Sequence, residues 1–504
     1  MSLSGEDKFG KGSNNYTKYG ATEHLGGEVT ANSTSGRIGD LNLTGSAFIG
    51  GDTQGLKIGK VNVESAVNSY DLESKQTSKN TVSKSSTYIK SHQEENVAGN
   101  LQLSGARIEG NLTGIGSNID LGENTFVGGK LITDSRELHN SFYEKNTSRG
   151  FSAGISHGTA SLNYGKSSSA YDEKDTINAK SNLRIGDGSV LNNGAEITAT
   201  NFEYGNIQIN NGDVKYGARI DTRDVKTTSR SSNFGVSIGI NSPIKDRVEQ
   251  AAGAVKQVRT GDTIGGLVAG VNAGYSTSKN SNNSHNESAV VTTMKPMNEN
   301  SSITYNNVNN ITYQGTQAQG GTFIYNNVKN IQKENVKNIQ KEAVELHNSY
   351  SSKNSGFGAG VSAGIGSNGQ IKPSSIGGNV SASRSNLNTT ETVYQNGNFQ
   401  NVNEVHNNTG TMTLSGFNQE GGKVTGNIGK LVVESRQNTS TTTGSSSGIG
   451  IGISANGMPN SVNVNGSRTN GSRAFVDNQS SFIVGEGSNL HVGTVENTGA
   501  IIGK

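Results

Sequence analysis

A three-part phrase recurs along this chain of 504 residues. Its fullest copy, KLITDSRELHNSFYEKNTSRGFSAGISHG at 130–158, joins an alternating apolar run, a Ser/Asn/Lys-rich stretch and a Gly-laced alternating run. All three parts return at 429–455, the middle and end return at 345–365, a looser version lies at 217–240, and the opening alone stands at 59–65. Four or five ordered copies indicate an internal repeat, and repeats of this kind fold by stacking on one another.

The composition supports a thin stacked structure rather than a thick globular core. Hydrophobic residues make up 30% of the chain, Gly accounts for 69 residues, and Trp and Cys are absent. Disorder is the alternative, because polar chains often cannot offset the entropy lost on ordering. Only 17% of the residues are charged, however, and Val, Ile and Leu fall in alternating runs. Small layers buried repeatedly fit this inventory better than disorder does.

Short alternating runs closed by Gly predict strands joined by tight corners. They occur at 36–65, 99–132 and 411–433, with Leu41 and Leu43 as one alternating pair. The shared core L-x-L-[ST]-G fits an all-β fold, a right-handed parallel β-helix with coils of about 20 residues. If most of the chain stacks in this way, roughly 20 coils would form a rod on the order of 100 Å long.

The polar stretches between these runs, such as 66–93 and 139–150, are expected to leave the rod. With the Gly-laced runs that follow them, they could form long hairpins or solvated loops. Alternation in GFSAGISHG, NFGVSIGIN and GIGIGISAN favours strands that carry Gly on one face.

Two segments differ from the rest. Ser242 and Pro243 resemble a helix cap and first turn, so 242–260 is predicted to be a short amphipathic helical insertion. The octapeptide NVKNIQKE occurs twice in tandem from residue 327, and the sequence does not decide between helix and short ladder strands. The predicted organisation is an irregular N-terminal segment, a β-helix, the helical insertion, an Asn/Ser-rich insertion with the octapeptide, and a second β-helix, at 1–35, 36–241, 242–260, 261–345 and 346–504.

The net charge, the N-terminal sequence and the length of the apolar runs limit the classes of protein to which this chain can belong. The net charge of +2, from 43 basic and 41 acidic residues, gives no electrostatic footprint for nucleic acid, so no nucleic-acid partner is expected. The N-terminus has neither the basic nor the apolar part of a signal peptide. No apolar run reaches the ~18–20 residues of a membrane-spanning helix.

The sequence offers no catalytic constellation. The absence of Cys excludes disulfides, thiolate catalysis and cysteine metal sites. His139 and His347 occupy the same slot of a repeated ELHNS, which favours a structural role over metal or haem binding. No phosphate-binding loop, nucleophile elbow or calcium repeat is present. We therefore predict no enzyme activity, no cofactor, and no catalytic, cofactor-binding or metal-binding residues. The eight histidines are scattered, at His24, His92, His139, His157, His285, His347, His406 and His491.

The repeats resemble a known family. The strings LQLSGA and GGKLITDSRELHNS, with TLSGFNQEGGKVTGNIGKLVVESRQNTSTTTGSSSGIGIGIS, are similar to the haemagglutinin repeats of filamentous haemagglutinins. Related large exoproteins of two-partner secretion, including contact-dependent growth-inhibition effectors, carry the same repeats. The resemblance covers about residues 36–504.

The resemblance implies a secreted, surface-displayed β-helical stalk that adheres to host or neighbouring cells. Its implied partners are a receptor or glycan on those cells and an outer-membrane secretion transporter. The alternative is the repeat stalk of a growth-inhibition effector that engages a receptor and helps to deliver a downstream toxin. The family's N-P-N secretion motif and a toxin domain are both absent here, so the chain is expected to be a fragment of a larger exoprotein.

Overall fold

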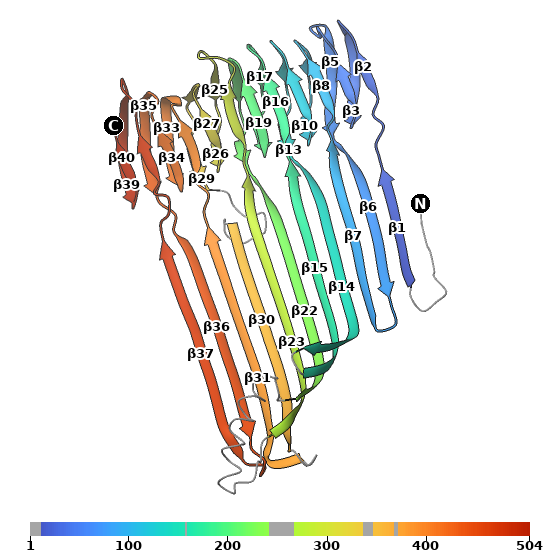
Figure 1. Ribbon diagram of the computed structural model, residues 1–504. Coiled ribbons are helices and arrows are strands. Elements are labelled where there is room, and N and C mark those ends of the chain that lie inside the picture. The colour runs from blue at the N-terminus through green and yellow to red at the C-terminus, as the bar shows by residue number, and fades with distance from the viewer. Residues whose placement is uncertain (1–11, 157–158, 241–266, 336–345, 367–370) are drawn as a thin grey trace.

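The computed structural model describes residues 12–156, 159–240, 267–335, 346–366 and 371–504, and every regular element within these ranges is a β-strand. Two parallel sheets wind into a β-helix, and one antiparallel sheet extends from it (Figure 1). We call the antiparallel sheet the blade. The prediction of an all-β parallel β-helix with hairpin excursions is confirmed.

One face of the β-helix is a parallel sheet of twelve short strands. Each strand belongs to one coil, so the helix has fewer coils than the 20 predicted and is roughly 50 Å long. The difference arises because the hairpins of the blade use much of the chain. The twelve strands are β2 (Glu28–Thr30), β4 (Ala47–Ile49), β8 (Asn100–Leu103), β11 (Asn118–Leu121), β16 (Ser181–Ile185), β19 (Thr200–Tyr204), β24 (Thr293–Pro296), β27 (Gln317–Gln319), β32 (Gly397–Gln400), β34 (Phe417–Glu420), β38 (Ser481–Ile483) and β40 (Ile501–Gly503).

The other two faces belong to one 17-stranded parallel sheet. The second face has β9 (Arg107–Ile108), β12 (Phe126–Val127), β17 (Val190–Leu191), β20 (Ile207–Asn210), β25 (Ser302–Asn306) and β28 (Thr322–Asn326). The third face has β10 (Leu112–Ile115), β13 (Leu131–Asp134), β18 (Ala195–Thr198), β21 (Val214–Gly217), β26 (Asn310–Gln314) and β29 (Asn330–Glu334). Five longer strands contribute to both faces: β3 (Gly36–Thr44), β5 (Leu56–Glu64), β33 (Asn403–Ser415), β35 (Val424–Glu434) and β39 (Asn489–Thr498).

Inward residues of equivalent strands stack directly above one another, which is why alternating apolar runs specify this fold. Leu112 pairs with Val61 on one side and with Leu131 on the other, and all three are fully buried. Each coil thus satisfies its backbone hydrogen bonds with its neighbours while it fills only a thin core. The stack continues through Ala195, Val214, Ile311, Ile331, Met412 and Leu431.

Asparagine ladders reinforce the stack on its outer side. The Nδ2 of Asn306 donates to Oδ1 of Asn210 at 2.9 Å, and Nδ2 of Asn326 donates to Oδ1 of Asn306 at 2.8 Å. Because an amide side chain is both donor and acceptor, each Asn can donate to the Asn of one neighbouring coil and accept from the Asn of the other. The ladder runs from Asn192 to Asn407.

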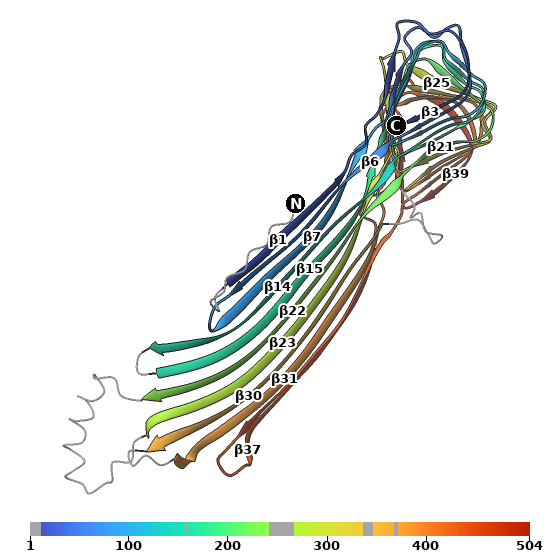
Figure 2. The same ribbon diagram turned by 90° about the vertical axis from the view of Figure 1, so that its right-hand side faces the viewer.

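The blade is an antiparallel sheet of eleven long strands in chain order. In Figure 2 it leaves the β-helix as a single curved layer. Its strands are β1 (Gly12–Thr22), β6 (Ala66–Lys79), β7 (Ser83–Val97), β14 (Arg136–Ser156), β15 (Thr159–Ala179), β22 (Arg219–Ile240), β23 (Leu267–Val290), β30 (Leu346–Gly366), β31 (Ile371–Val393), β36 (Asn438–Ile453) and β37 (Pro459–Phe475).

Hairpins and tight corners alternate at one edge of the β-helix. Five hairpins leave between the third and first faces, and every coil in between turns there through one residue with positive φ. A hairpin spans two strand spacings, about 9.6 Å, which equals the rise of two coils. Hairpins on every second coil can therefore pair into one continuous sheet. The corner residues are Gly45, Gly116, Ala199, Gly315, Gly416 and Gly499.

The described parts of two predicted segments differ from expectation. The segment 1–35, expected to be irregular, includes β1 and β2. The segment 261–345, expected to be an insertion, continues the blade as β23 and the β-helix as β24 to β29. Its coils bury Tyr305, Tyr313 and Tyr325, so the usual apolar pattern is weaker there. The first octapeptide copy contributes β29, and the predicted helix at 242–260 lies outside the described residues.

Candidate interaction surface

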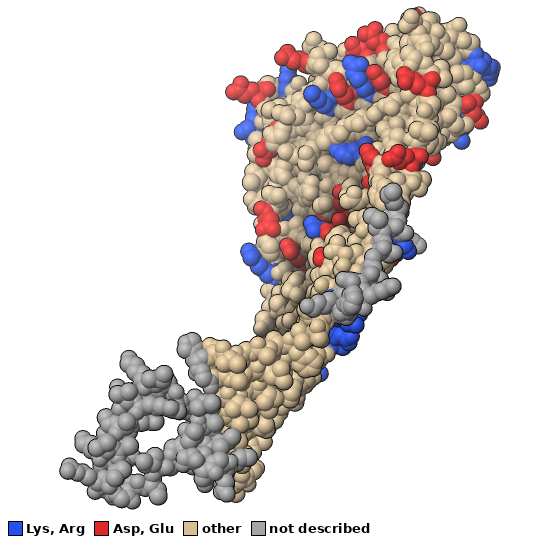
Figure 3. Space-filling model, turned by 45° about the vertical axis from the view of Figure 1, so that its right-hand side comes forward, with Lys and Arg blue, Asp and Glu red and all other residues tan. Residues whose placement is uncertain are grey.

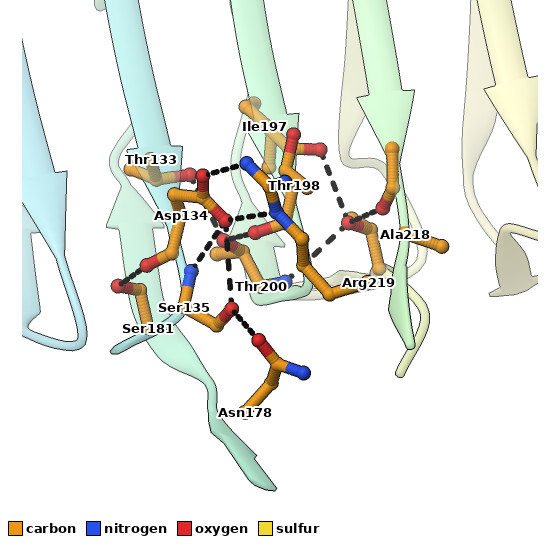
Figure 4. A network of polar contacts seen from close by, with 12 residues as sticks. Thr133, Asp134, Ser135, Asn178, Ser181, Ile197, Thr198, Thr200, Ala218 and Arg219 are labelled. Carbon is orange, nitrogen blue, oxygen red and sulfur yellow. Dashed lines mark hydrogen bonds and ion pairs between the residues drawn. The ribbon is translucent and has the colours of Figure 1, made fainter. Parts of the chain in front are cut away.

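The blade is fixed to the β-helix by an ion pair and by hydrogen bonds at its root. Arg219, the first residue of β22, donates from Nε to Asp134 Oδ1 at 3.0 Å and also contacts Oδ2 (Figure 4). Asp134 closes β13, which precedes the neighbouring hairpin. In an equivalent place, Arg136 donates to the side chain of Ser65 at 2.9 Å and to its carbonyl at 3.0 Å. The first residue of each of these hairpins therefore holds the root of the hairpin before it.

A column of buried hydroxyls lies directly behind this root. Thr133 and Thr200 share a hydrogen bond of 2.9 Å, and Thr200 also donates to the carbonyl of Thr198 at 2.8 Å (Figure 4). These hydroxyls satisfy backbone carbonyls where the chain turns between faces. The column consists of Ser117, Ser181, Thr200, Thr292, Thr316 and Ser480, all fully buried.

The repeated ELHNS forms a clasp between neighbouring hairpins. The backbone N–H of His139 donates to Glu94 Oε1 at 2.7 Å, and the side-chain oxygen of Asn140 accepts from the backbone N–H of Glu94 at 2.9 Å. His347 and Asn348 make the same two bonds with Glu287. His139 and His347 thus contribute their backbone N–H groups, and not their imidazole rings, to the two clasps.

A second pair of histidines lies beside these clasps. The Nδ1 of His285 is 2.5 Å from Asp224 Oδ1, and its Nε2 is 3.3 Å from Glu287 Oε2. Partial burial lowers the pKa of His285, but the two carboxylates more than offset this effect, so the pKa is raised. His92 lies in the same way between Asp71 and Glu94, and its pKa is also raised, chiefly by the hydrogen bond to Asp71.

These histidines predict a pH dependence of blade stability. A pKa raised in the folded state stabilises the fold below the unfolded value of about 6.5, and this contribution is lost as the pH rises through the folded value. We expect the His285→Gln variant to melt below wild type at about pH 6 and to approach it at about pH 9. Thermal unfolding followed by circular dichroism checks this. A difference that grows with pH would contradict it.

The distal blade has two chemically distinct faces. Residues directly opposite in adjacent antiparallel strands point to the same side of a sheet. One row across eight strands is Phe151, Tyr164, Phe234, Tyr275, Ala359, Val380, Ile451 and Val462, and the next row on this side is Ala153, Leu162, Val236, Ala273, Val361, Gly378 and Ile453. We call this side the apolar face. The row between them, on the polar face, is Ser152, Asn163, Gly235, Gly274, Gly360, Asn379, Gly452 and Ser461.

The apolar face is open to solvent. Ile155 is 88% exposed, Val361 is 63% exposed and Phe151 is 53% exposed. On the polar face, where many positions are Gly and have no side chain, there is a shallow hollow of about 650 Å³, lined by Gly235, Gly274 and other small residues. Contiguous exposed apolar surface is typical of interaction sites, because monomeric soluble proteins rarely keep large patches of it.

Among the described residues, Asp and Glu lie on the β-helix and on the part of the blade next to it. In Figure 3 they lie over the β-helix and the adjoining strands, whereas the lower described blade is uncharged apart from a few Lys and Arg side chains. The described blade residues within 75–88, 145–170, 228–281, 353–386 and 445–468 contain no Asp or Glu. The described residues of the distal blade therefore carry only positive charge.

The β-helix core contains a polar network that the sequence did not reveal. Lys333 Nζ lies 3.0 Å from Glu404 Oε2, and both side chains are fully buried. Tyr325 donates to the same oxygen at 3.0 Å, and His406 Nε2 lies 3.5 Å from Glu404 Oε1. Burial would raise the pKa of Glu404, but Lys333 and its other partners hold it well below its usual range. The available signal was the alternation of Ile331 with Lys333, which places Lys333 inward.

Neither a metal centre nor a membrane helix was found in the described ranges. No group of three or more His, Asp or Glu side chains there could hold a metal ion. No helix there is long and apolar enough to cross a bilayer.

Comparison with known protein families gives a match to part of the chain. Residues 273–449 match the family model described as a hemagglutinin repeat, which is typical of filamentous haemagglutinin-type exoproteins. No curated protein and no solved structure matches the chain. The matched range runs from β23 to β36 and so includes both β-helix coils and blade hairpins.

Proposed function

We propose that this chain, in which residues 273–449 are haemagglutinin repeat, is a stalk region of a secreted exoprotein that mediates adhesion to host or neighbouring cells. The β-helix is the stalk, and the distal blade is the adhesive surface. The full-length protein would reach the cell surface through an outer-membrane two-partner secretion transporter. The chain acts by binding and carries out no catalysis.

The observation that carries this proposal is the exposed apolar face of the blade. Five hairpins, each tied to its neighbour at the root, present one broad surface away from the β-helix (Figure 2). An adhesin needs a surface of this kind, displayed at a distance from its own cell. A purely structural rod would gain nothing from exposed aromatic residues such as Phe234 and Tyr275, which are 49% and 44% exposed.

A cell-binding assay with a matched pair of variants tests the proposal. Phe234 and Tyr275 lie directly opposite each other in β22 and β23. We expect Phe234→Ser with Tyr275→Ser to reduce binding of the labelled chain to whole cells at least about tenfold. The control, Asn233→Ser with Ser276→Ala, alters the adjacent opposed pair on the other face and is expected to bind like wild type. Unchanged binding by the first variant would contradict adhesion through the apolar face.

A further inference from the structure

We propose that the distal blade docks on the anionic surface of a lipid bilayer, with its apolar face toward the lipid. This inference rests on the proposed function, because it names the chemistry of the partner that the blade contacts. Three features of the apolar face carry it: rows of unneutralised cations, a row of aromatic side chains, and aliphatic rows nearest the tip.

The first feature is a ladder of four cations in four adjacent strands. Lys79 is directly opposite Lys84, Lys84 is opposite Arg149, and Arg149 is opposite Lys166. All four residues are exposed. Like charges directly opposite each other destabilise a sheet. A sheet that keeps such a ladder with no acidic residue between its members is suited to a partner that supplies negative charge.

A second row of cations lies in the following strands. Arg230 is directly opposite Lys279, and Arg384 lies in the same row beyond Ser355. These three side chains are also exposed, and they form no ion pair in the part of the chain that the structure describes. The positive charge therefore extends across much of the width of the blade.

The order of the rows matches the layers of a bilayer surface. The row of Arg149 is followed on the same face by the row of Phe151 and Phe234, and then by the row of Leu162 and Val361. Lys and Arg are attracted to anionic headgroups, aromatic rings favour the interface, and aliphatic side chains favour acyl chains. Basic, aromatic and aliphatic rows thus succeed one another toward the tip in the order that the depth of a bilayer requires.

The polar face determines how the blade would lie. Its distal rows hold Ser, Asn and Gly, with no side chain suited to hydrocarbon. The backbone groups inside the sheet are already paired, so lipid contact leaves them satisfied. An amphipathic helix lies on a membrane with its apolar face toward the acyl chains, and the blade would lie with its apolar face toward the lipid in the same way.

Two other occupants fit these rows less well. In a face-to-face pair of two copies, the apolar rows would pack, but nothing would neutralise the cation ladders. A sulfated glycan would neutralise the ladders but leave the aliphatic rows exposed. The membrane surface is the partner that accounts for both features.

Vesicle co-sedimentation of the full chain tests the proposal. Wild type is expected to bind vesicles that contain about a third phosphatidylglycerol at least about tenfold more tightly than pure phosphatidylcholine vesicles, and added salt is expected to weaken this binding. The Arg230→Gln, Lys279→Gln, Arg384→Gln variant is expected to lose about tenfold or more of that binding. Its fold should be retained or stabilised, because a like-charge pair is removed. Phe234→Ser with Tyr275→Ser is expected to lose binding to both vesicle types.

The results separate the lipid proposal from the adhesive function. Equal sedimentation of wild type with both vesicle types, or none with either, would overturn the lipid proposal. If the triple variant then still lost binding to whole cells, the blade would remain adhesive toward an anionic protein or glycan. Self-association of the chain that Phe234→Ser with Tyr275→Ser abolishes, without vesicle binding, would assign the face to a second copy. If the triple variant and the Phe234→Ser, Tyr275→Ser variant both bound cells like wild type, the adhesive function itself would fail.

Discussion

Replacing Glu404 with alanine is expected to lower the free energy of unfolding by about 3–5 kcal/mol. The substitution leaves the ammonium group of Lys333 buried without its countercharge. It also removes the acceptor for the hydroxyl of Tyr325, which lies in a chain of buried tyrosines. Urea denaturation followed by far-UV circular dichroism measures the change.

The matched control removes both charges together. Lys333→Met with Glu404→Met is expected to lose less than half of what Glu404→Ala loses, because no unpaired charge remains. A double variant that is no more stable than Glu404→Ala would contradict this explanation.

The pH dependence of the stability follows from the pKa of Glu404. Because the pKa of Glu404 is lowered in the fold, its ionised carboxylate contributes stability above the unfolded value of about 4.3, and this contribution is lost as the pH falls through the folded value.

Deleting one coil that bears no hairpin is expected to disrupt the blade. Removal of residues 181–199 joins Lys180 directly to Thr200. Thr200 pairs with Ser181 from the next coil, so it takes the place of Ser181 after the deletion. Hairpins β14–β15 and β22–β23 would then leave adjacent coils, about 4.8 Å apart, although each needs two strand spacings. The eighteen residue pairs between β15 and β22 could not form together. We expect loss of cooperative thermal unfolding and rapid proteolysis of the blade.

A longer deletion is the control for this prediction. Removal of residues 181–291 takes out two coils and one hairpin, so hairpins still leave every second coil and β15 faces β30. This variant is expected to keep cooperative unfolding and protease resistance although it lacks far more of the chain. The reverse ranking of the two variants would show that hairpin spacing does not depend on the coil rise.

The sequence predicted the β-helix because the inward positions repeat. Alternating pairs such as Leu41 and Leu43, closed by Gly45, mark a strand and its corner without knowledge of the fold. The Gly-laced runs were likewise predicted to be strands, and the described runs are the distal strands of the blade. The alternation of hairpins with tight corners was not predicted, because it arises from the match between two strand spacings and two coils.

The features that the sequence missed depend on contacts between distant residues. Lys333 and Glu404 are 71 positions apart, so the alternation that places Lys333 inward does not reveal its partner. The cation ladder has the same property, because Lys84 and Arg149 become neighbours only when two hairpins pair. The helix predicted at 242–260 lies outside the described residues and stays a prediction.

A distance measured across the blade tests most directly whether the five hairpins form one continuous sheet. The chain has no Cys, so Ser78→Cys in β6 and Asn465→Cys in β37 can carry two spin labels without background. These strands are nine spacings apart in the sheet, so pulsed electron paramagnetic resonance is expected to show one narrow distribution near about 40 Å. A broad distribution, or one centred far from this value, would show that the hairpins leave the β-helix independently, and it would contradict a blade with two continuous faces.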